Sequence, residues 1–275
     1  MASHLTVGLA QIDCRLGAVE ENLERHFEWI AKGRERQVEL LLFPELSLTG
    51  YRLLHLTSQV AIRLHDSEVI DRLIEAAGSM SVVVGLVEED EEGFLHNSAV
   101  LIHDGRIAHV HRKLYLPTYG IFQEGRFFGP GSRLELASID GGSVGFLICE
   151  DLWHPHLARR LALAGGKMLA VLSAGPGRVG SGEAMESQDT WECLTRSTAL
   201  VNTSWVLYCN RVGWEEGSFY AGASHIVRPD GQLLMRASDL EEDFLVARLD
   251  LREVDRVRWR TPLLQSHRRD IEGLR

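Results

Sequence analysis

Long apolar runs and closely spaced cysteines are both missing from this chain of 275 residues. No run approaches the roughly 20 residues that a membrane-spanning helix needs, and the first segment, MASHLTVGLA, lacks the charged and apolar regions of a signal peptide. The four cysteines, Cys14, Cys149, Cys193 and Cys209, form no close pairs, so we expect no disulfide framework. We therefore expect a cytoplasmic protein with no membrane contact, in which Cys14, Cys193 and Cys209 are small buried residues.

Positive charge is scarce as well. Lys and Arg number 29 against 39 Asp and Glu, the formal net charge is −10, and the basic residues are spread along the chain. Such a chain has no positive face to attract a polyanion, which argues against nucleic acid as a partner. A hydrophobic content of 45% and a charged content of 25% are those of an ordinary soluble protein. We expect one compact domain over residues 1–275, with its core at about 5–250.

Strand and helix patterns alternate along the whole chain. The segment 18–36 has helical spacing, with Leu23, Phe27 and Ile30 on one face, and it lies between two apolar runs that are typical of strands. DG at 104–105 and PDG at 229–231 are turn signals between further strand-like runs. We expect helices at 18–36, 67–80, about 153–164 and 187–202, strands at 5–12, 38–46, 81–89, 133–139, 143–149, 167–174, 204–213 and 244–251, and hairpins at 94–113 and 223–238.

The order of these elements indicates the fold class. Parallel crossovers and antiparallel hairpins, with helices contributed along the whole length, predict a layered α/β architecture with mixed sheets. Runs such as SVVVGLV and GFLIC are apolar on both faces, as in sheets that are covered on both sides. Two stacked sheets with helices outside them satisfy both observations.

Three of the predicted strands end abruptly at a reactive polar residue. Glu45 follows the run ELLLFP, Lys113 follows IAHVHR, and Cys149 follows GFLI. In layered α/β folds the ends of strands often carry the site, because the sheet fixes the geometry while the loops admit substrate. Taken one at a time, these residues could equally be a solvated loop acid, a surface base and a core thiol.

Taken together, the three residues have complementary chemistry. A free thiol has a pKa of about 8.5 and is mostly protonated at neutral pH, and a lysine and a following helix N-terminus would lower that pKa. A carboxylate beside the thiol can accept its proton. We therefore predict that Cys149 is a nucleophile, rather than a core thiol or a metal ligand.

The chain resembles the carbon–nitrogen hydrolase, or nitrilase, superfamily, in the branch of amidases and NAD synthetase glutaminases. The resemblance rests on FPELSLTGY around Glu45, RKLYLPTYGIFQEGRFFGPG around Lys113 and LICEDLWHP around Cys149, and it extends through NRVGWEEG to about Asp250. It implies an α/β fold with mixed sheets, a four-layer αββα sandwich of the nitrilase type. It also implies a Glu-Lys-Cys triad in which Cys149 attacks an amide carbonyl, Glu45 is general base and then acid, and the Lys113 ammonium stabilises the oxyanion.

Three more acids lie near these motifs. The resemblance places Glu124, in GIFQEGRFF, where the family has a second glutamate that helps to position the substrate and shares in proton transfer. The alternative is that Glu124 pairs with Arg126 on a surface loop. Glu150 and Asp151 follow the nucleophile, and we interpret them as acids at a helix start that accept backbone amides.

A metal site is the main alternative to thiol chemistry. HVH at 109–111 and HPH at 154–156 could contribute imidazole ligands, but no HExxH or paired-cysteine spacing supports zinc, and we expect these histidines at the surface or the pocket edge. The glycine-rich run SAGPGRVGSGEA lacks the ending of a phosphate-binding loop, so we interpret it as a flexible loop over the pocket. We expect neither a metal nor a cofactor.

The expected function is hydrolysis of a non-peptide C–N bond in a small amide through a cysteine thioester, with release of ammonia. The alternative is a glutaminase subunit that supplies ammonia to a separate synthetase, such as NAD synthetase. A catalytically silent scaffold is disfavoured, because all three reactive residues are present. The resemblance further implies a homodimer or higher homo-oligomer, with contacts made by the helix after Cys149 and by the tail at 251–275.

Overall fold

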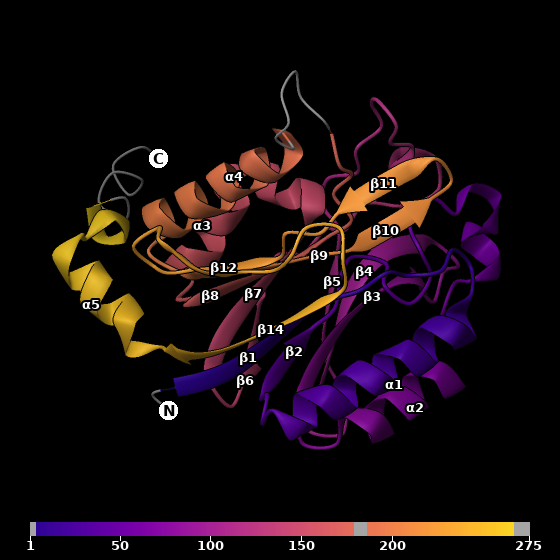
Figure 1. Cartoon of the computed structure of the whole chain (residues 1–275), viewed down its shortest axis with the longest axis horizontal. Coiled ribbons are helices and arrows are strands. Elements are labelled where there is room, and N and C mark those ends of the chain that lie inside the picture. The colour runs from indigo at the N-terminus through magenta and orange to yellow at the C-terminus, as the bar shows by residue number, and fades with distance from the viewer. Residues whose placement is uncertain (1–3, 179–185, 267–275) are drawn as a thin grey trace.

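The computed structural model describes residues 4–178 and 186–266, and helices alternate with strands along the chain (Figure 1). The strands are β1 (His4–Gln11), β2 (Leu40–Leu42), β3 (Ser81–Glu89), β4 (Leu95–His103), β5 (Arg106–Arg112), β6 (Leu136–Ile139), β7 (Gly142–Ile148), β8 (Met168–Ser173), β9 (Trp205–Asn210), β10 (Val212–Glu215), β11 (Ser218–Ala221), β12 (His225–Val227), β13 (Leu233–Arg236) and β14 (Asp243–Asp250). The α-helices are α1 (Val19–Glu35), α2 (Glu68–Ala77), α3 (Pro155–Leu163), α4 (Glu186–Asn202) and α5 (Arg252–Arg260), and short 3₁₀ helices form at Leu54–Gln59, Glu124–Arg126 and Cys149–Trp153.

Two six-stranded mixed sheets form the centre of the fold. Their strand orders are β14-β1-β2-β3-β4-β5 and β13-β12-β9-β8-β7-β6. The middle of each sheet is parallel, with β1, β2 and β3 in the first sheet and β7, β8 and β9 in the second, and the outer pairs are antiparallel. The parallel centres place the carboxyl ends of β2 and β3 at one edge of the first sheet, and those of β7 and β8 at one edge of the second.

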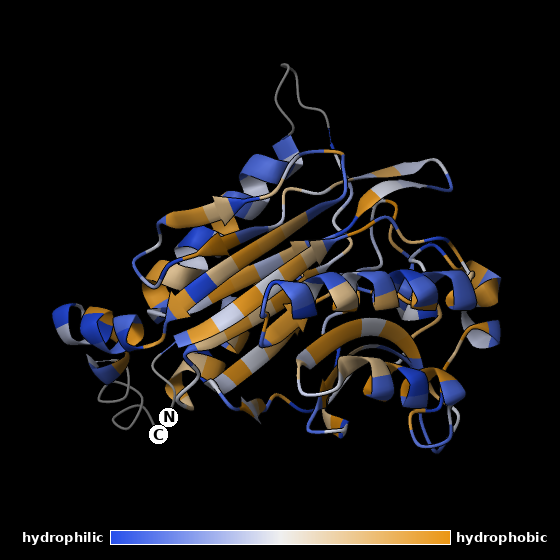
Figure 2. Cartoon of the chain, turned by 60° about the horizontal axis from the view of Figure 1, so that its bottom comes forward, coloured by the Kyte–Doolittle hydropathy of each residue, from blue (hydrophilic) through white to orange (hydrophobic). Residues whose placement is uncertain are grey.

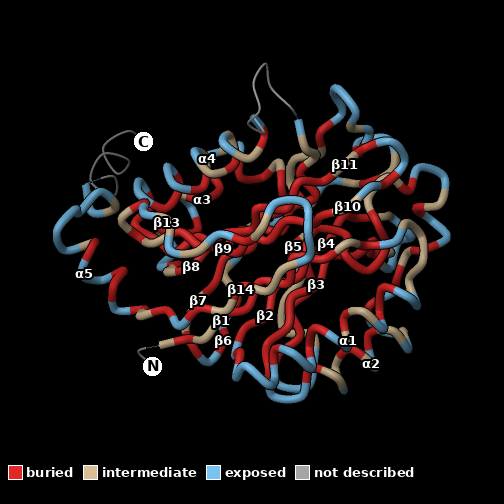
Figure 3. Tube along the Cα trace, in the orientation of Figure 1, coloured by how far each residue is buried: buried red, intermediate tan, exposed pale blue. Residues whose placement is uncertain are grey.

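The central strands are buried on both faces. Along β3, Val83 packs between the two sheets, whereas Val82 and Val84 pack beneath α1 and α2, as the two-residue period of a strand requires. β8 and β9 are buried along their whole length (Figure 3). α1 and α2 cover the outer face of the first sheet, and α3 and α4 cover that of the second (Figure 1). The predicted four-layer αββα sandwich is therefore confirmed.

The helices are amphipathic, as the spacing of their apolar residues predicts. Leu23 and Ile30 of α1 are buried against the sheet and Phe27 is half-buried, while α2 buries Ile70 and Leu73. Figure 2 shows many hydrophilic residues along these helices, beside strands that are largely hydrophobic. The helices thus close the hydrophobic faces of the sheets.

Three elements differ from the prediction. The helix expected from Trp153 begins at Pro155, because the chain first makes a 3₁₀ turn over Cys149–Trp153. The strand expected at 38–46 is regular only over Leu40–Leu42. The strand expected at 204–213 is interrupted at Arg211, and β10 then pairs with β11 in a separate two-stranded sheet that the sequence analysis missed.

The predicted pocket loop and the C-terminal tail are each only partly described. The glycine-rich run extends into residues 179–185, and the tail at 251–275 extends into residues 267–275, and both of these stretches lie outside the described residues. The described part of the tail forms α5, which extends from β14 at one side of the sandwich (Figure 1). Within residues 4–178 and 186–266, no helix is both long enough and apolar enough to cross a membrane.

Candidate active site

The structure brings the four predicted site residues together from different elements. Glu45 follows β2, Lys113 follows β5, Cys149 follows β7, and Glu124 lies on the short helix Glu124–Arg126. All four are buried, with exposed fractions between 1% and 6%. The residues that the sequence placed at strand ends therefore meet in one buried cluster, which contains a thiol, an ammonium and two carboxylates.

The Glu45 carboxylate is held by three donors. Its Oε1 accepts hydrogen bonds from Lys113 Nζ at 2.7 Å and from Asn97 Nδ2 at 2.8 Å, and its Oε2 accepts one from the backbone N–H of Ala174 at 2.7 Å. The turn that carries Glu45 lies directly against Gly85 of β3, where an added Cβ would lie 2.4 Å from Pro44 O and from Leu46 N. Gly85 is therefore the residue that lets this turn approach the sheet.

Lys113 bridges the two carboxylates. Its Nζ donates to Glu45 Oε1 and to Glu124 Oε1, each at 2.7 Å, and its side chain is fully buried. Burial alone would lower the pKa of the lysine, but the two carboxylates outweigh it and hold the pKa of Lys113 well above its usual value. The lysine is therefore an ammonium at any physiological pH. Among the described residues its Nζ donates to these two acids, which leaves one of the three ammonium protons for another acceptor.

Glu124 belongs to the site and not to a surface pair with Arg126. Its Oε1 accepts from Lys113 Nζ and from the hydroxyl of Tyr51, while its buried Oε2 has no hydrogen-bond partner among the described residues. Arg126 instead donates to Gln123. Burial, partly offset by Lys113 and reinforced by Glu45, raises the pKa of Glu124 to about 7. A carboxyl group with this pKa exchanges protons near neutral pH.

Cys149 stands at a strained turn at the end of β7. Its backbone φ is +46°, a left-handed conformation that is uncommon for residues other than glycine and that clusters at functional sites. Burial and the Glu45 charge raise the pKa of the thiol well above its usual value, although Lys113 and a hydrogen bond with Ser173 act in the opposite direction. The expectation of a lowered pKa is therefore wrong for the net effect, although Lys113 acts in the predicted direction. At rest Cys149 is a neutral thiol that needs a base.

Asp151 ties the cysteine turn to the lysine loop. Its Oδ1 accepts from the backbone N–H groups of Leu114 and Tyr115, and its Oδ2 accepts from that of Ile148 and lies 3.0 Å from His111 Nε2. The interpretation of Asp151 as an acid that accepts backbone amides agrees with these contacts. Two of the amides directly follow Lys113, so one buried carboxylate fixes the cysteine turn against the lysine segment.

Glu150 and Tyr119 form a second polar pair beside the nucleophile. The Tyr119 hydroxyl donates to Glu150 Oε2 at 2.8 Å, and Glu150 Oε1 lies 3.9 Å from His154 Nε2. The Glu150 side chain is 16% exposed, and Tyr119 and Trp153 nearby in the sequence are exposed. Glu150 therefore presents a carboxylate at the rim of the site, unlike the buried acids below it.

The histidines of the two predicted metal motifs lie in different surroundings. His111 is buried against Asp151, whereas His109 stacks on Phe146 and His154 stacks on Tyr115. The expectation that all of them lie at the surface or the pocket edge is therefore wrong for His111. Its imidazole completes the hydrogen bonding of a structural carboxylate.

A different group of potential metal ligands occurs at the opposite end of the strands. His103, Asp104 and Asp140 place one ligand atom each within 4.8 Å of one another, and both aspartates are exposed. Asp140 precedes β7, whereas Cys149 follows it, so the seven residues of β7 separate this group from Cys149. At about 3.3 Å per residue it lies roughly 20 Å from the catalytic chemistry.

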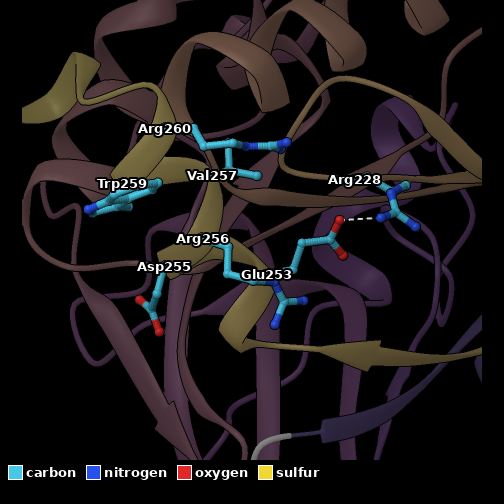
Figure 4. Close-up of a pocket in the computed structure, with 7 residues that line it drawn as sticks. All are labelled: Arg228, Glu253, Asp255, Arg256, Val257, Trp259 and Arg260. Atoms are coloured by element: carbon cyan, nitrogen blue, oxygen red, sulfur yellow. Dashed lines mark hydrogen bonds and ion pairs between the residues drawn. The ribbon is translucent and has the colours of Figure 1, made fainter.

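A wide pocket beside α5 is also remote from the four site residues. It has a volume of about 660 Å³, and Figure 4 shows its lining, in which Glu253 pairs with Arg228. The lining residues are Arg228, Glu253, Asp255, Arg256, Val257, Trp259 and Arg260. This pocket contains no nucleophile, and the exposed Trp259 makes it a candidate contact surface.

The remaining cysteines separate into two kinds. Cys14 and Cys209 are buried, as expected, and burial raises the pKa of each. Cys193 on α4 is exposed, so its predicted burial is wrong. The free cysteine at the surface is thus a different residue from the one in the site.

Sequence reasoning missed the groups that hold the two buried glutamates of the site. Asn97 contacts Glu45, and Tyr51 contacts Glu124. Asn97 carries a weak signal, because it is an amide in a strand that continues into the apolar run AVLI, and an amide that is buried there needs a partner. Tyr51 carries no such signal, because its contact depends on how a loop folds back.

Comparison with known proteins gives a consistent assignment. The family model for carbon-nitrogen hydrolase matches residues 6–259. A glutamine-dependent NAD(+) synthetase of Aquifex aeolicus is 32% identical over 262 residues, which cover 93% of this chain and 45% of that protein. The chain thus spans less than half the length of this curated relative.

Two solved structures show the same fold. A carbon-nitrogen hydrolase from Helicobacter pylori G27 has a TM-score of 0.85 and 27% identity, with 98% of this chain and 96% of that chain covered. A glutamine-dependent NAD+ synthetase from Acinetobacter baumannii has a TM-score of 0.80 and 26% identity, with 90% of this chain and 46% of that chain covered.

Proposed function

Because this chain belongs to the carbon–nitrogen hydrolase family, we propose that it is a glutaminase that hydrolyses the glutamine side-chain amide through a thioester on Cys149 and supplies the ammonia to a synthetase. The observation that carries the hydrolase chemistry is the buried cluster in which Lys113 Nζ lies 2.7 Å from both Glu45 and Glu124 beside Cys149. The glutamine preference and the synthetase partner are supported by the similarity to glutamine-dependent NAD(+) synthetases.

In the proposed acylation, the Cys149 sulfur attacks the amide carbonyl carbon. Since the thiol is neutral at rest, its proton passes to Glu45 as the carbon–sulfur bond forms. The carbonyl oxygen becomes an oxyanion, and the remaining ammonium proton of Lys113 stabilises it. Protonation of the amide nitrogen by the Glu45 carboxyl then allows the carbon–nitrogen bond to break, so that ammonia leaves and a thioester remains.

Hydrolysis of the thioester uses the same groups. Glu45 removes a proton from water, and the hydroxide equivalent attacks the thioester carbonyl, whose oxygen again lies against Lys113. Collapse breaks the carbon–sulfur bond, and the proton returns to the cysteine sulfur. The free Oε2 of Glu124 gives the substrate amide or the water an acceptor on the other side of the lysine.

The rim of the site favours a substrate with a positive charge. Glutamine carries an α-ammonium a few bonds from its amide, and Glu150 offers a carboxylate beside the nucleophile, with one oxygen already held by Tyr119. A charge-assisted hydrogen bond at this point would orient the substrate. A simple aliphatic amide has no group that could use it.

The second candidate function is that of a free-standing amidase for small amides. It is favoured by the match to the Helicobacter pylori carbon-nitrogen hydrolase, of which this chain covers 96%. The two functions share the chemistry at Cys149 and differ in what Glu150 contacts.

Ammonia release from a substrate panel tests both candidates. We expect glutamine to be turned over with a higher kcat/KM than propionamide or a nitrile, and Glu150→Gln to reduce kcat/KM for glutamine while leaving propionamide unchanged. Faster turnover of simple amides than of glutamine would support the amidase instead. Cys149→Ala, which removes the nucleophile, is the control for contaminating activity.

We also propose that two copies associate through the α5 surface. Trp259 is 85% exposed at the edge of the α5 pocket, and tryptophan is enriched at protein–protein interfaces. The arginines and acids around it can form a polar rim about an apolar centre (Figure 4). A second copy of the chain presents the same residues and would be self-complementary across a twofold axis.

A further inference from the structure

A buried ion pair joins Arg211, between β9 and β10, to Glu215 at the end of β10, and it lies outside the four site residues. Arg211 donates to Glu215 Oε2 at 2.6 Å, and their side chains are 1% and 2% exposed. The Arg211 guanidinium also donates to the Cys14 carbonyl at 2.8 Å and lies 4.3 Å from the centre of the Tyr220 ring. Both charges are thus fixed from several sides, as a buried pair must be.

The Glu215 carboxylate reaches across to the loop that follows Glu45. It accepts hydrogen bonds from the backbone N–H of Tyr51 at 3.1 and 3.2 Å and from that of Arg52 at 2.6 Å. The preceding Gly50 has a φ of +79°, and an added Cβ there would lie 3.1 Å from Glu215 Oε2. The Glu215 side chain therefore fixes the position of the Tyr51 backbone.

The side chain of Tyr51 ends at a residue of the site. Its hydroxyl donates to Glu124 Oε1, the same oxygen that accepts from Lys113 Nζ at 2.7 Å. Phe122 and Tyr220 pack edge-on against the Tyr51 ring, with centroids 6.4 and 6.2 Å away. Tyr51 is therefore held by hydrogen bonds to its backbone and by aromatic contacts to its ring.

From these contacts we propose that Tyr51 is a positioning residue for Glu124, and that the Arg211–Glu215 pair is the anchor that keeps Tyr51 in place. The proposal rests on the hydrolase function of the site. Two donors on Oε1 set the plane of the Glu124 carboxylate and leave Oε2 unpartnered for the substrate. Among the described residues, Lys113 and Tyr51 are the hydrogen-bond donors to this carboxylate.

The surroundings of Glu124 make the hydroxyl necessary. A small pocket of about 30 Å³, close to the size of one water molecule, adjoins Tyr51 and Glu124. Without the hydroxyl, the carboxylate could turn toward that space. The groups that act on Glu124 are Lys113, Glu45 and Tyr51, and of these the Tyr51 hydroxyl and Lys113 favour the charged form and keep the pKa of Glu124 from rising further.

Tyr51→Phe and Glu215→Gln, alone and combined, test the proposal. We expect Tyr51→Phe to lower kcat/KM by about ten- to hundredfold, since a hydrogen bond to a charged group is lost. The limb of the pH profile that requires ionised Glu124 should move to higher pH. Glu215→Gln should show the same two effects, and the double variant should be no slower than the slower single variant, because both act through one contact.

Glu24→Gln is the control, because it also removes a glutamate that is ion-paired with an arginine, Arg72, but lies on the outer face of α1. It should leave kcat/KM and the pH profile unchanged even where it lowers stability. A Tyr51→Phe enzyme with the wild-type rate and profile, or single effects that multiply in the double variant, would overturn the proposal. If the wild type hydrolyses no amide at all, the proposed function fails instead.

Discussion

Replacing Glu124 with glutamine should change the pH dependence of folding stability. The folded pKa of Glu124 is raised from 4.5 to about 7, mainly by burial. A carboxyl whose pKa is raised on folding contributes stability that is present below the unfolded pKa and is lost as pH rises through the folded pKa. The rise corresponds to about 3 kcal/mol, at about 1.4 kcal/mol per pH unit between pH 4.5 and 7.

The amide of Glu124→Gln cannot ionise, so it should escape this loss. Its carbonyl oxygen can still accept from Lys113 and from Tyr51, which keeps the packing near that of the wild type. Relative to the wild type, the variant should therefore gain up to about 3 kcal/mol of unfolding free energy between pH 4.5 and pH 8. Its turnover should fall, because the neutral amide cannot offer the charged acceptor that Glu124 Oε2 gives the substrate or the water in the proposed mechanism.

Urea unfolding of both proteins at several pH values measures this difference directly. Glu89→Gln is the control, since it removes an ion pair with the exposed Arg63 and should change stability by less than about 1 kcal/mol at every pH. A difference between wild type and Glu124→Gln that stays constant from pH 4.5 to pH 8 would refute the raised pKa. A variant with full activity would refute the role of Glu124.

Three further predictions concern the rest of the site and the α5 surface. Lys113→Met leaves Glu45 and Glu124 buried without their cation, so urea unfolding at pH 8 should show a loss of about 3–5 kcal/mol and ammonia release should fall at least about 100-fold; a stable, active variant would contradict the bridge. In the native wild type, iodoacetamide should modify the exposed Cys193 before Cys149, and peptide mass mapping showing the reverse order would contradict the raised pKa of Cys149. Trp259→Glu should shift the mass measured by light scattering from dimer to monomer, and a wild type that is already monomeric at micromolar concentration would exclude the α5 contact.

The layers of the fold were predictable because local patterns determine them. The run of apolar residues in β3 predicts a strand that is buried on both faces, and this is what the structure shows. Leu23 and Ile30 show the helical period of α1. The sequence analysis missed the β10–β11 sheet because Arg211 interrupts the apolar run after β9. The ion-pair partner of the Arg211 guanidinium, Glu215, lies in the next strand. A buried pair of charges cannot be inferred from periodicity, since each residue alone has the pattern of a surface residue.

The candidate site was predictable to a similar extent. Glu45, Lys113 and Cys149 each follow an apolar run, so their positions at strand ends could be read from the sequence. The sign of the change in the pKa of Cys149 could not be, because it depends on how completely the site excludes water. Lys113 lowers that pKa, as the sequence analysis expected, but burial and Glu45 act more strongly in the opposite direction.

The same burial explains how the site can hold a thiol that stays unreactive when no substrate is bound. The apolar strands that deliver Cys149 also remove it from water, so the neutral thiol is favoured, and Glu45 is held by Lys113, Asn97 and the Ala174 amide. In the proposed mechanism, proton transfer from sulfur to Glu45 becomes favourable only when a substrate carbonyl oxygen lies against Lys113 and shares its positive charge. Nucleophilic reactivity is therefore coupled to the presence of an amide in the site.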